Sequence, residues 1–79
     1  MYTRVLTYDL KYASTDNYKE LYDYFEKVGA KKLTESSYLI KTYLDWDSFK
    51  SKILSITKSG DNVKAIVIAD NELKVWNIR

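Results

Sequence analysis

Asp9 is the residue of this chain that is best suited to chemistry. It closes an apolar, β-prone run that begins at Tyr2, and the chain contains neither histidine nor cysteine. A carboxylate at a strand end loses free energy on burial unless it is solvated, paired or bound to a metal ion. Asp9 is therefore the first candidate for a metal ligand or an acid–base group. A structural role is the alternative, in which the carboxylate caps the strand end by accepting N–H bonds from the following loop.

The missing residue types exclude several other chemistries. Without histidine and cysteine the chain has no Ser-His or Cys-His nucleophile system and no thiolate or imidazole zinc site. Gly29 and Gly60 are its only glycines, and both are expected at helix ends, so there is no glycine-rich phosphate loop. Hard carboxylate oxygens remain, and these suit Mg²⁺ or Mn²⁺.

The charge is close to balanced, with 13 basic and 11 acidic residues and a net charge of +2. This is too even to predict nucleic-acid binding from electrostatics alone. Only Arg4 and Arg79 are arginines, so bidentate contacts to bases or phosphates are scarce. Eight tyrosines and two tryptophans are many for 79 residues. Tyrosine is enriched at protein interfaces and stacks on bases, but it also fills the edge of a small core.

Length and composition indicate a single domain over residues 1–79. No disulfide is possible, which fits a reducing compartment. The start of the chain has no apolar signal-peptide core, and no apolar run approaches the roughly 20 residues of a membrane span. We therefore expect a soluble, cytoplasmic protein that does not associate with a membrane.

The first elements that must position Asp9 are a strand and a helix. Residues 2–10 alternate and are rich in β-formers, which predicts a strand. Residues 11–16 are polar and break the pattern. Asn17 followed by Glu20 resembles a capping box at a helix start, and Gly29 is expected to end that helix. The apolar stripe of this helix comprises Tyr18, Leu21, Tyr22, Phe25 and Val28.

The middle of the chain predicts a hairpin and a second helix. Residues 30–35 form a short strand and 38–44 a stronger one, with an ill-defined turn around Ser36 and Ser37. Asp45 is the expected N-cap of the second helix, which Gly60 is expected to end. The apolar face of this helix comprises Trp46, Phe49, Ile53 and Ile56.

The last third of the chain predicts two further strands. Residues 63–69 are almost continuously apolar, which is typical of a strand buried on both faces. Asp70 and Asn71 fit a two-residue turn, and residues 72–78 alternate as a final strand. The whole order predicts an α+β fold, a ferredoxin-like βαββαβ sandwich with an extra C-terminal strand. Both helices would lie on one face of an antiparallel sheet.

In this fold the second face of the sheet is uncovered, yet strands 2–10 and 63–69 carry apolar residues at both parities. An exposed apolar sheet is unusual for a monomer, and twofold homodimers are the commonest oligomers. We therefore predict a homodimer, in which strand 72–78 could pair with the partner's sheet edge. The expected interface residues are Leu6, Ile66, Ile68, Val75 and Trp76.

Three segments together resemble the small CRISPR-associated protein 2 family and its SinR-like and VapD-like relatives. They are Val5–Leu10, the helix that ends at Gly29, and Leu33–Thr42. The family's first strand ends in an aromatic–Asp pair, and a later strand carries a serine followed by an aromatic residue. The match covers nearly the whole chain in order and spacing.

The resemblance implies a ferredoxin-like homodimer in which Asp9 is the catalytic, metal-binding aspartate. Two copies of it would face each other across the twofold axis and hold one Mg²⁺ or Mn²⁺, which would activate water against a phosphodiester. Tyr8, Lys11 and Ser37 are then the expected substrate-binding residues. Ser37 matches the family's small polar position, and Tyr8 matches the aromatic, which is expected to pack rather than react.

The chain also departs from the family. Many members carry an arginine-rich stretch at the start of the first helix, whereas Asp16–Glu20 here is neutral to acidic. Two functions therefore stay open. One is a metal-dependent nuclease or nucleic-acid-binding dimer, acting on RNA or DNA. The other is a non-catalytic module of a virus or mobile element, which uses its tyrosine-rich surface to inhibit or scaffold a protein partner.

Overall fold

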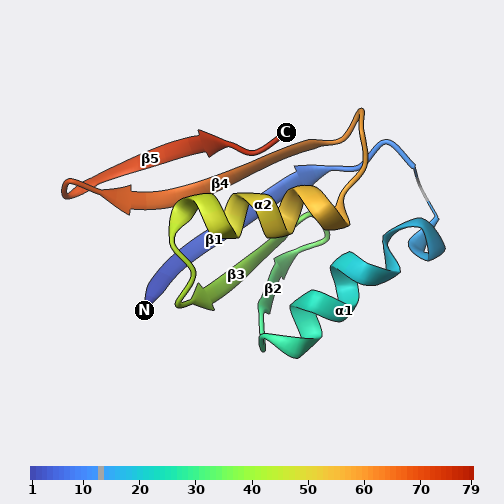
Figure 1. The fold of residues 1–79 in the computed structure, drawn as a ribbon, viewed down its shortest axis with the longest axis horizontal. Helices are drawn as coiled ribbons and strands as arrows, with labels where there is room; N and C mark the ends of the chain where they lie inside the picture. The colour runs from blue at the N-terminus through green and yellow to red at the C-terminus, as the bar shows by residue number, and fades with distance from the viewer. Residues whose placement is uncertain (13) are drawn as a thin grey trace.

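The computed structural model describes residues 1–12 and 14–79, and its elements form an α+β fold (Figure 1). Ala13, within the predicted break at 11–16, lies outside the described residues. The elements are β1 (Tyr2–Asp9), the 3₁₀ turn η1 (Thr15–Tyr18), α1 (Lys19–Lys27), β2 (Lys31–Thr34), β3 (Ser37–Thr42), α2 (Trp46–Ile56), β4 (Asn62–Ala69) and β5 (Glu72–Asn77). The five strands form one sheet in the order β2-β3-β1-β4-β5, and every neighbouring pair is antiparallel.

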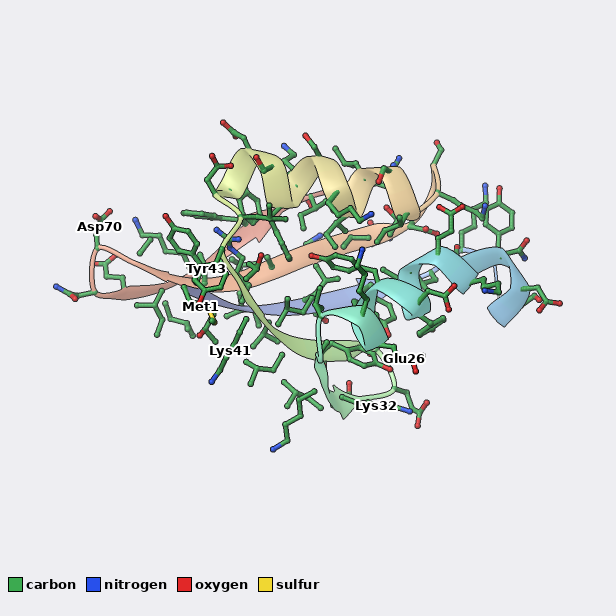
Figure 2. All side chains as sticks on the ribbon, turned by 60° about the horizontal axis from the view of Figure 1, so that its bottom comes forward. Met1, Glu26, Lys32, Lys41, Tyr43 and Asp70 are labelled. Atoms are coloured by element: carbon green, nitrogen blue, oxygen red, sulfur yellow. The ribbon has the colours of Figure 1, made fainter. Side chains whose placement is uncertain are left out.

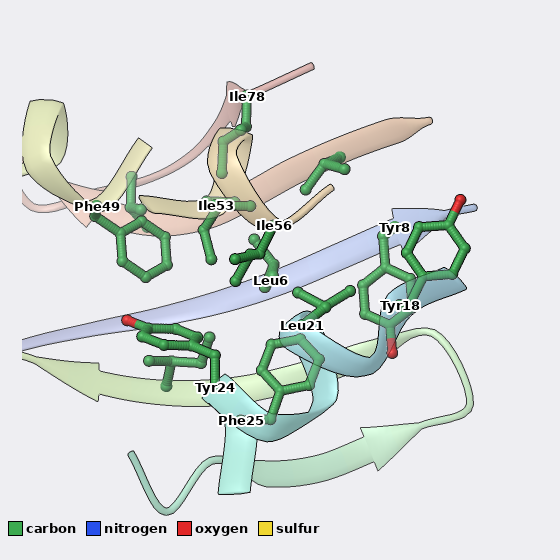
Figure 3. Close-up of a cluster of buried hydrophobic side chains, with 14 residues drawn as sticks. Leu6, Tyr8, Tyr18, Leu21, Tyr24, Phe25, Phe49, Ile53, Ile56 and Ile78 are labelled. Carbon is green, nitrogen blue, oxygen red and sulfur yellow. The ribbon is translucent and has the colours of Figure 1, made fainter. Parts of the chain in front are cut away.

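Both helices bury their apolar faces in one core against the same side of the sheet. Figure 3 shows Phe49, Ile53 and Ile56 of α2 near Leu6 of β1, with Phe25 of α1 in the same cluster. The largest side chains with essentially no exposure are Phe49, Leu6, Leu21, Ile40, Ile53 and Val63. The apolar side chains recur every 3.6 residues in the helices and every two residues in the strands. Both sets therefore face the same layer between the helices and the sheet.

Several predicted signals are confirmed. The Asp45 carboxylate accepts a 2.8 Å hydrogen bond from Ser48 N and caps α2. Gly29 has φ +66° and follows α1 in a Schellman arrangement, in which its N–H reaches Glu26 O and Ala30 N–H reaches Phe25 O. These contacts satisfy carbonyls that the helix end leaves without partners.

Two predicted helix boundaries are wrong. Asn17 is not an N-cap, because the chain enters α1 through η1, and Ser14 Oγ accepts from Asp16 N at 3.2 Å instead. Gly60 does not end α2, which stops at Ile56 with Thr57 in an extended conformation. Gly60, with φ +96°, lies in the turn that leads into β4.

The β4–β5 hairpin is confirmed as a tight turn. Asp70 and Asn71 have φ of 55° and 63°, the left-handed pair that a two-residue turn requires. Ala69 pairs with Glu72 across it. The structure thus pairs β5 with β4 of its own chain, and Figure 2 shows Asp70 at the tip of this hairpin.

The register separates the two faces of the sheet. Leu6, Ala65 and Trp76 form one cross-strand row, and Leu6 is fully buried under the helices. The prediction that Leu6 contributes to a dimer interface is therefore wrong. Trp76 also belongs to the helix side, where its ring meets Trp46 at 4.8 Å. Strict alternation along each strand explains both corrections, since residues of equal parity share a face.

The opposite side, called here the open face, carries the remaining apolar residues. Leu39, Val5, Ile66 and Val75 are successive partners across β3, β1, β4 and β5. Ile68 and Leu73 form the next pair beside them. Figure 2 shows Lys41 of β3 extending to the side away from α2, which is this face.

The sheet is not continuous over its whole length. The β1–β4 ladder runs from the Asp9–Asn62 pair to the Val5–Ile66 pair. Beyond it, residues 2–4 pair only with β3 and residues 67–69 only with β5. In Figure 1 the start of β1 and the β4–β5 turn lie apart at the same end of the molecule.

Candidate functional site

Asp9 is the last residue of β1 and lies exposed on the open face, opposite Asn62 of β4. Within residues 1–12 and 14–79, no hydrogen bond or ion pair joins its carboxylate to another side chain or to the backbone. The carboxylate is therefore solvated and available to an external ligand. No described residue of the loop that follows the strand donates a hydrogen bond to it.

Asp61, which sequence reasoning missed, does this structural work instead. Its Oδ1 accepts from Lys11 N at 2.8 Å and from Tyr18 Oη at 2.6 Å, and its Oδ2 accepts from Lys58 N at 2.8 Å. The residue is 3% exposed. Burial raises the pKa of Asp61, but the hydrogen bonds from Tyr18, Lys11 and Lys58 outweigh it and hold the pKa below its usual value.

A signal for Asp61 was present in the sequence. An aspartate directly after Gly60 and before an apolar strand is typical of a side chain that organises a turn. What the pattern could not show is that the same carboxylate also reaches the loop after β1, 50 residues away in the chain.

Asp9 borders a hollow of about 200 Å³ at the end of β1, together with Tyr8, Glu35 and Ser36. The Tyr8 ring packs on Phe25 with centroids 6.1 Å apart, as the sequence predicted, while its hydroxyl donates a long 3.4 Å bond to Glu35 O. Burial raises the pKa of Tyr8 from its usual value, so this phenol stays protonated.

Ser37 and Lys11 lie on different sides of Asp9. Ser37 is on the open face of β3, paired with Thr7, and its Oγ is 2.7 Å from Thr34 Oγ1. Lys11 lies beyond the strand end, with its side chain along Gly60, where an added Cβ would come within 2.6 Å of Lys11 Cδ. The structure thus brings Asp9 and Ser37 to one face, on adjacent strands.

The described residues do not gather a cluster of acidic side chains around one point. Among the described residues, no group of three Asp or Glu side chains is placed to hold one ion. Asp9 alone offers one carboxylate, whereas Mg²⁺ in proteins is typically held by one or two carboxylates with several waters retained. One carboxylate is the low end of this range, and a second copy of Asp9 would raise the number to two.

Both arginines are engaged within the chain. Arg4 is 4% exposed and donates from Nη1 to Leu44 O at 2.8 Å. Arg79 donates to Thr57 Oγ1 at 3.2 Å and to Leu54 O at 2.8 Å, which ties the C-terminal residue to the end of α2. Any phosphate contact on the surface would thus fall to lysines.

The open face is strongly apolar at the β4–β5 side. Ile68, Leu73 and Val75 are 77%, 74% and 61% exposed. They adjoin the half-buried row of Val5, Leu39 and Ile66, so the apolar surface of the open face spans four strands. Contiguous exposure of this kind marks an interaction surface more often than isolated apolar residues do.

Among the described residues, none of the helices combines the length and the apolar character that crossing a membrane requires.

Comparison of the chain with protein-family models, with curated proteins and with solved structures yields no match. The resemblance to the CRISPR-associated protein 2 family therefore stays a prediction.

Proposed function

We propose that this protein acts as a homodimer, joined through the open face, that binds nucleic acid and uses two Asp9 carboxylates with Mg²⁺ or Mn²⁺ to cleave phosphodiesters. One observation carries the proposal. Asp9 is exposed, its carboxylate has no hydrogen bond or ion pair with another described residue, and it lies on the same face as the apolar row. A structural carboxylate would have partners, as Asp61 has.

We further assign the fold to the ferredoxin-like class. The supporting facts are the βαββαβ order with an added strand, and the sheet order in which β3 lies between β1 and β2. The connection from β1 to β2 contains α1, and the connection from β3 to β4 contains α2. Both helices pack on the same side of the sheet, which leaves the other side free for a second copy.

The position of the twofold axis decides whether two Asp9 residues can meet. If the axis runs along β1 between two stacked sheets, Val5 faces Val5, Leu39 faces Ile66, and Asp9 faces Asp9. Sheets stack about 10 Å apart, so two inward carboxylates would come within reach of one cation. The same axis thus buries the apolar rows and pairs the acids.

An axis across the strands would separate the acids. Asp9 lies four residues beyond Val5, about 13 Å along the strand. Rotation about an axis perpendicular to β1 at Val5 would place the two Asp9 residues roughly 26 Å apart along the strands.

A nitroxide label on Asp9→Cys, the sole cysteine of that variant, distinguishes the two arrangements by dipolar distance measurement. The longer distance would contradict the shared metal site.

Within such a dimer, the two Asp9 carboxylates would hold the cation, and a cation there supplies an activated water and charge stabilisation for phosphodiester attack. Ser37 lies on the adjacent strand of the same face and can donate a hydrogen bond toward a phosphate oxygen. Lys64, exposed opposite Thr7, adds positive charge beside it.

The test is incubation of labelled RNA and duplex DNA with the protein and Mg²⁺ or Mn²⁺, then with a chelator, for wild type and Asp9→Asn. Cleavage that requires the metal and disappears in Asp9→Asn supports the proposal. Asp16→Asn, another exposed aspartate, serves as the matched control and should retain activity. Cleavage that survives in Asp9→Asn would assign it to a contaminant or to another site.

A second function, the non-catalytic protein-binding module, is favoured by a different observation. Arg4 and Arg79 each donate hydrogen bonds to acceptors of their own chain, which leaves fewer arginine donors for phosphate. In that case the open face would take a protein partner. Absence of RNA and DNA binding even at low salt, where phosphate-driven binding is strongest, would support this function over the first.

A further inference from the structure

A second hollow, of about 430 Å³, lies beyond the Val5–Ile66 pair, where the pairing between β1 and β4 ends. We call it the Arg4 hollow. It belongs mainly to the helix side of the sheet, away from Asp9, and requires neither the metal site nor the dimer. Its lining residues of the helix-side parity are Tyr2, Arg4, Val67, Ala69 and Trp76, with Trp46 from the first turn of α2. Its volume lies in the usual range of small-molecule pockets.

Arg4 is a buried cation that forms no direct ion pair, although the Asp45 carboxylate at the start of α2 lies near enough to raise the pKa of Arg4. It is 4% exposed, and no carboxylate of the described residues lies within 4.0 Å of its guanidinium, since the ion pairs present involve only lysines. Burial lowers the pKa of Arg4, yet arginine remains protonated in proteins. A buried, unpaired charge is costly, and an anion brought to it would relieve that cost.

The guanidinium keeps donors free. It has five N–H groups, and only Nη1 has a protein acceptor, Leu44 O. No side-chain nitrogen or oxygen that is sealed from solvent lacks a hydrogen bond in the described chain. The other guanidinium nitrogens must therefore retain contact with solvent, and the hollow that Arg4 lines provides it.

Aromatic rings shape the rest of the site. The Arg4 guanidinium lies 4.7 Å from the Tyr2 ring centroid and 4.8 Å from that of Phe49. Trp46 and Trp76 meet edge to face at 4.8 Å and form one wall. No acidic residue and no lysine lines the hollow. Arg4 is the charged side chain of this lining, and a cation beside aromatic walls suits an anionic ligand with a flat ring.

We propose that the Arg4 hollow binds a small aromatic carboxylate, whose carboxylate pairs with the free guanidinium N–H groups and whose ring lies against Trp46 and Trp76. Paired N–H donors of arginine match the two oxygens of a carboxylate, which adds direction to the charge attraction.

The tryptophans provide a local readout, because Trp46 and Trp76 are the only two in the chain and both line the hollow. Phenylacetate, titrated into the protein with excitation at the red edge of tryptophan absorption, should change the emission saturably at millimolar concentrations or below. Phenylacetamide, which has the same shape but no charge, should bind at least about tenfold more weakly, since a charge-assisted hydrogen bond contributes about 1.5–3 kcal/mol.

Two variants and one control complete the test. Arg4→Lys keeps the charge but not the paired donors and should weaken phenylacetate binding about tenfold. Ala69→Phe fills the hollow from β4 and should abolish binding with Arg4 intact. Lys64→Ala, on the open face, should bind as wild type does. Unaltered thermal unfolding cooperativity shows that each variant is folded.

The proposal is overturned if phenylacetate produces no saturable change, or if phenylacetamide binds equally well. Undiminished binding by Ala69→Phe would also overturn it, because the ligand would then lie elsewhere.

Discussion

Two aspartates of this chain have opposite roles, and their surroundings decide which is which. Asp61 is buried and accepts three hydrogen bonds, whereas Asp9 is exposed and accepts none from the described residues. Removal of a buried acceptor leaves its donors unsatisfied, at about 1–3 kcal/mol for each group. Removal of a solvated carboxylate leaves nothing unsatisfied. Stability measurements therefore separate Asp61, the structural acid, from Asp9, the acid we propose to be functional.

We expect Asp61 to make stability depend on acid pH. Its folded-state pKa lies below the usual 3.8, so the folded protein binds fewer protons there than the unfolded chain does. The contribution is complete above the unfolded pKa and is lost as the pH falls through the folded pKa. Asp61→Asn, which cannot accept from both Oδ positions, should lower the free energy of unfolding by about 1–3 kcal/mol at neutral pH and by much less near pH 2.

Denaturant unfolding as a function of pH measures this difference. Asp9→Asn is the control and should leave the free energy of unfolding unchanged, because its carboxylate has no partner among the described residues. An equal loss in both variants, or a loss in Asp61→Asn that persists unchanged in acid, would contradict the assignment.

At the scale of elements, local caps and turns set where each helix and strand ends. Gly29 closes α1 with a left-handed φ of +66°, and Asp70 and Asn71 close the β4–β5 hairpin with two left-handed residues. Each device satisfies backbone groups without any distant contact. The centre of the sheet in turn depends on long-range pairing, because β1 lies between β3 and β4, which come much later in the chain.

Gly29→Ala should isolate the backbone contribution of that cap. No atom lies within 4 Å of a Cβ placed at Gly29, so the substitution adds left-handed strain without a steric clash. We expect a loss of about 1–2 kcal/mol, which corresponds to a fall in Tm of roughly 4–8 °C for each kcal/mol. Ser51→Ala, on the exposed side of α2, is the control and should be neutral or slightly stabilising. A neutral Gly29→Ala would show that the α1 end relaxes to another conformation.

At the scale of the whole molecule, the two sides of the sheet are used differently. One side buries its residues under both helices, and the other presents the apolar row of the open face. A 9.3 kDa chain buries only a modest part of its surface in its own core. Association that buries the open face would therefore add stability, and it would also bring the two Asp9 residues of the proposed site together.

Ile66→Lys should disrupt the proposed dimer while preserving the fold. Ile66 lies within the apolar row, where a lysine would place a charge against the apolar side chains of the second copy, Leu39 among them. Analytical ultracentrifugation should show a dimer for wild type and a 9.3 kDa monomer for the variant. Ser51→Lys, on the outer side of α2, adds the same charge and should remain dimeric. A monomeric wild type at micromolar concentration would contradict the dimer directly.

Much of this fold could be predicted from the sequence, since helices and strands differ in apolar period and their ends carry local signals. The α+β class, the element order, the Asp45 cap, the Gly29 end and the Asp70–Asn71 turn all depend on residues within a few positions of each other. Local conformational preference is enough to determine such features.

Other features depended on which segments meet in space, and tertiary structure alone decided them. The register moved Leu6 and Trp76 to the helix side and left Ile66, Ile68 and Val75 on the open face. Folding brought Lys11, Tyr18 and Lys58 onto one carboxylate, and so assigned the capping role to Asp61 and left Asp9 free. It also separated β1 from β4 beyond Val5 and enclosed Arg4 among aromatic rings. Each of these is a contact between distant residues, and the local pattern of a chain does not specify which distant groups will satisfy its charges and hydrogen bonds.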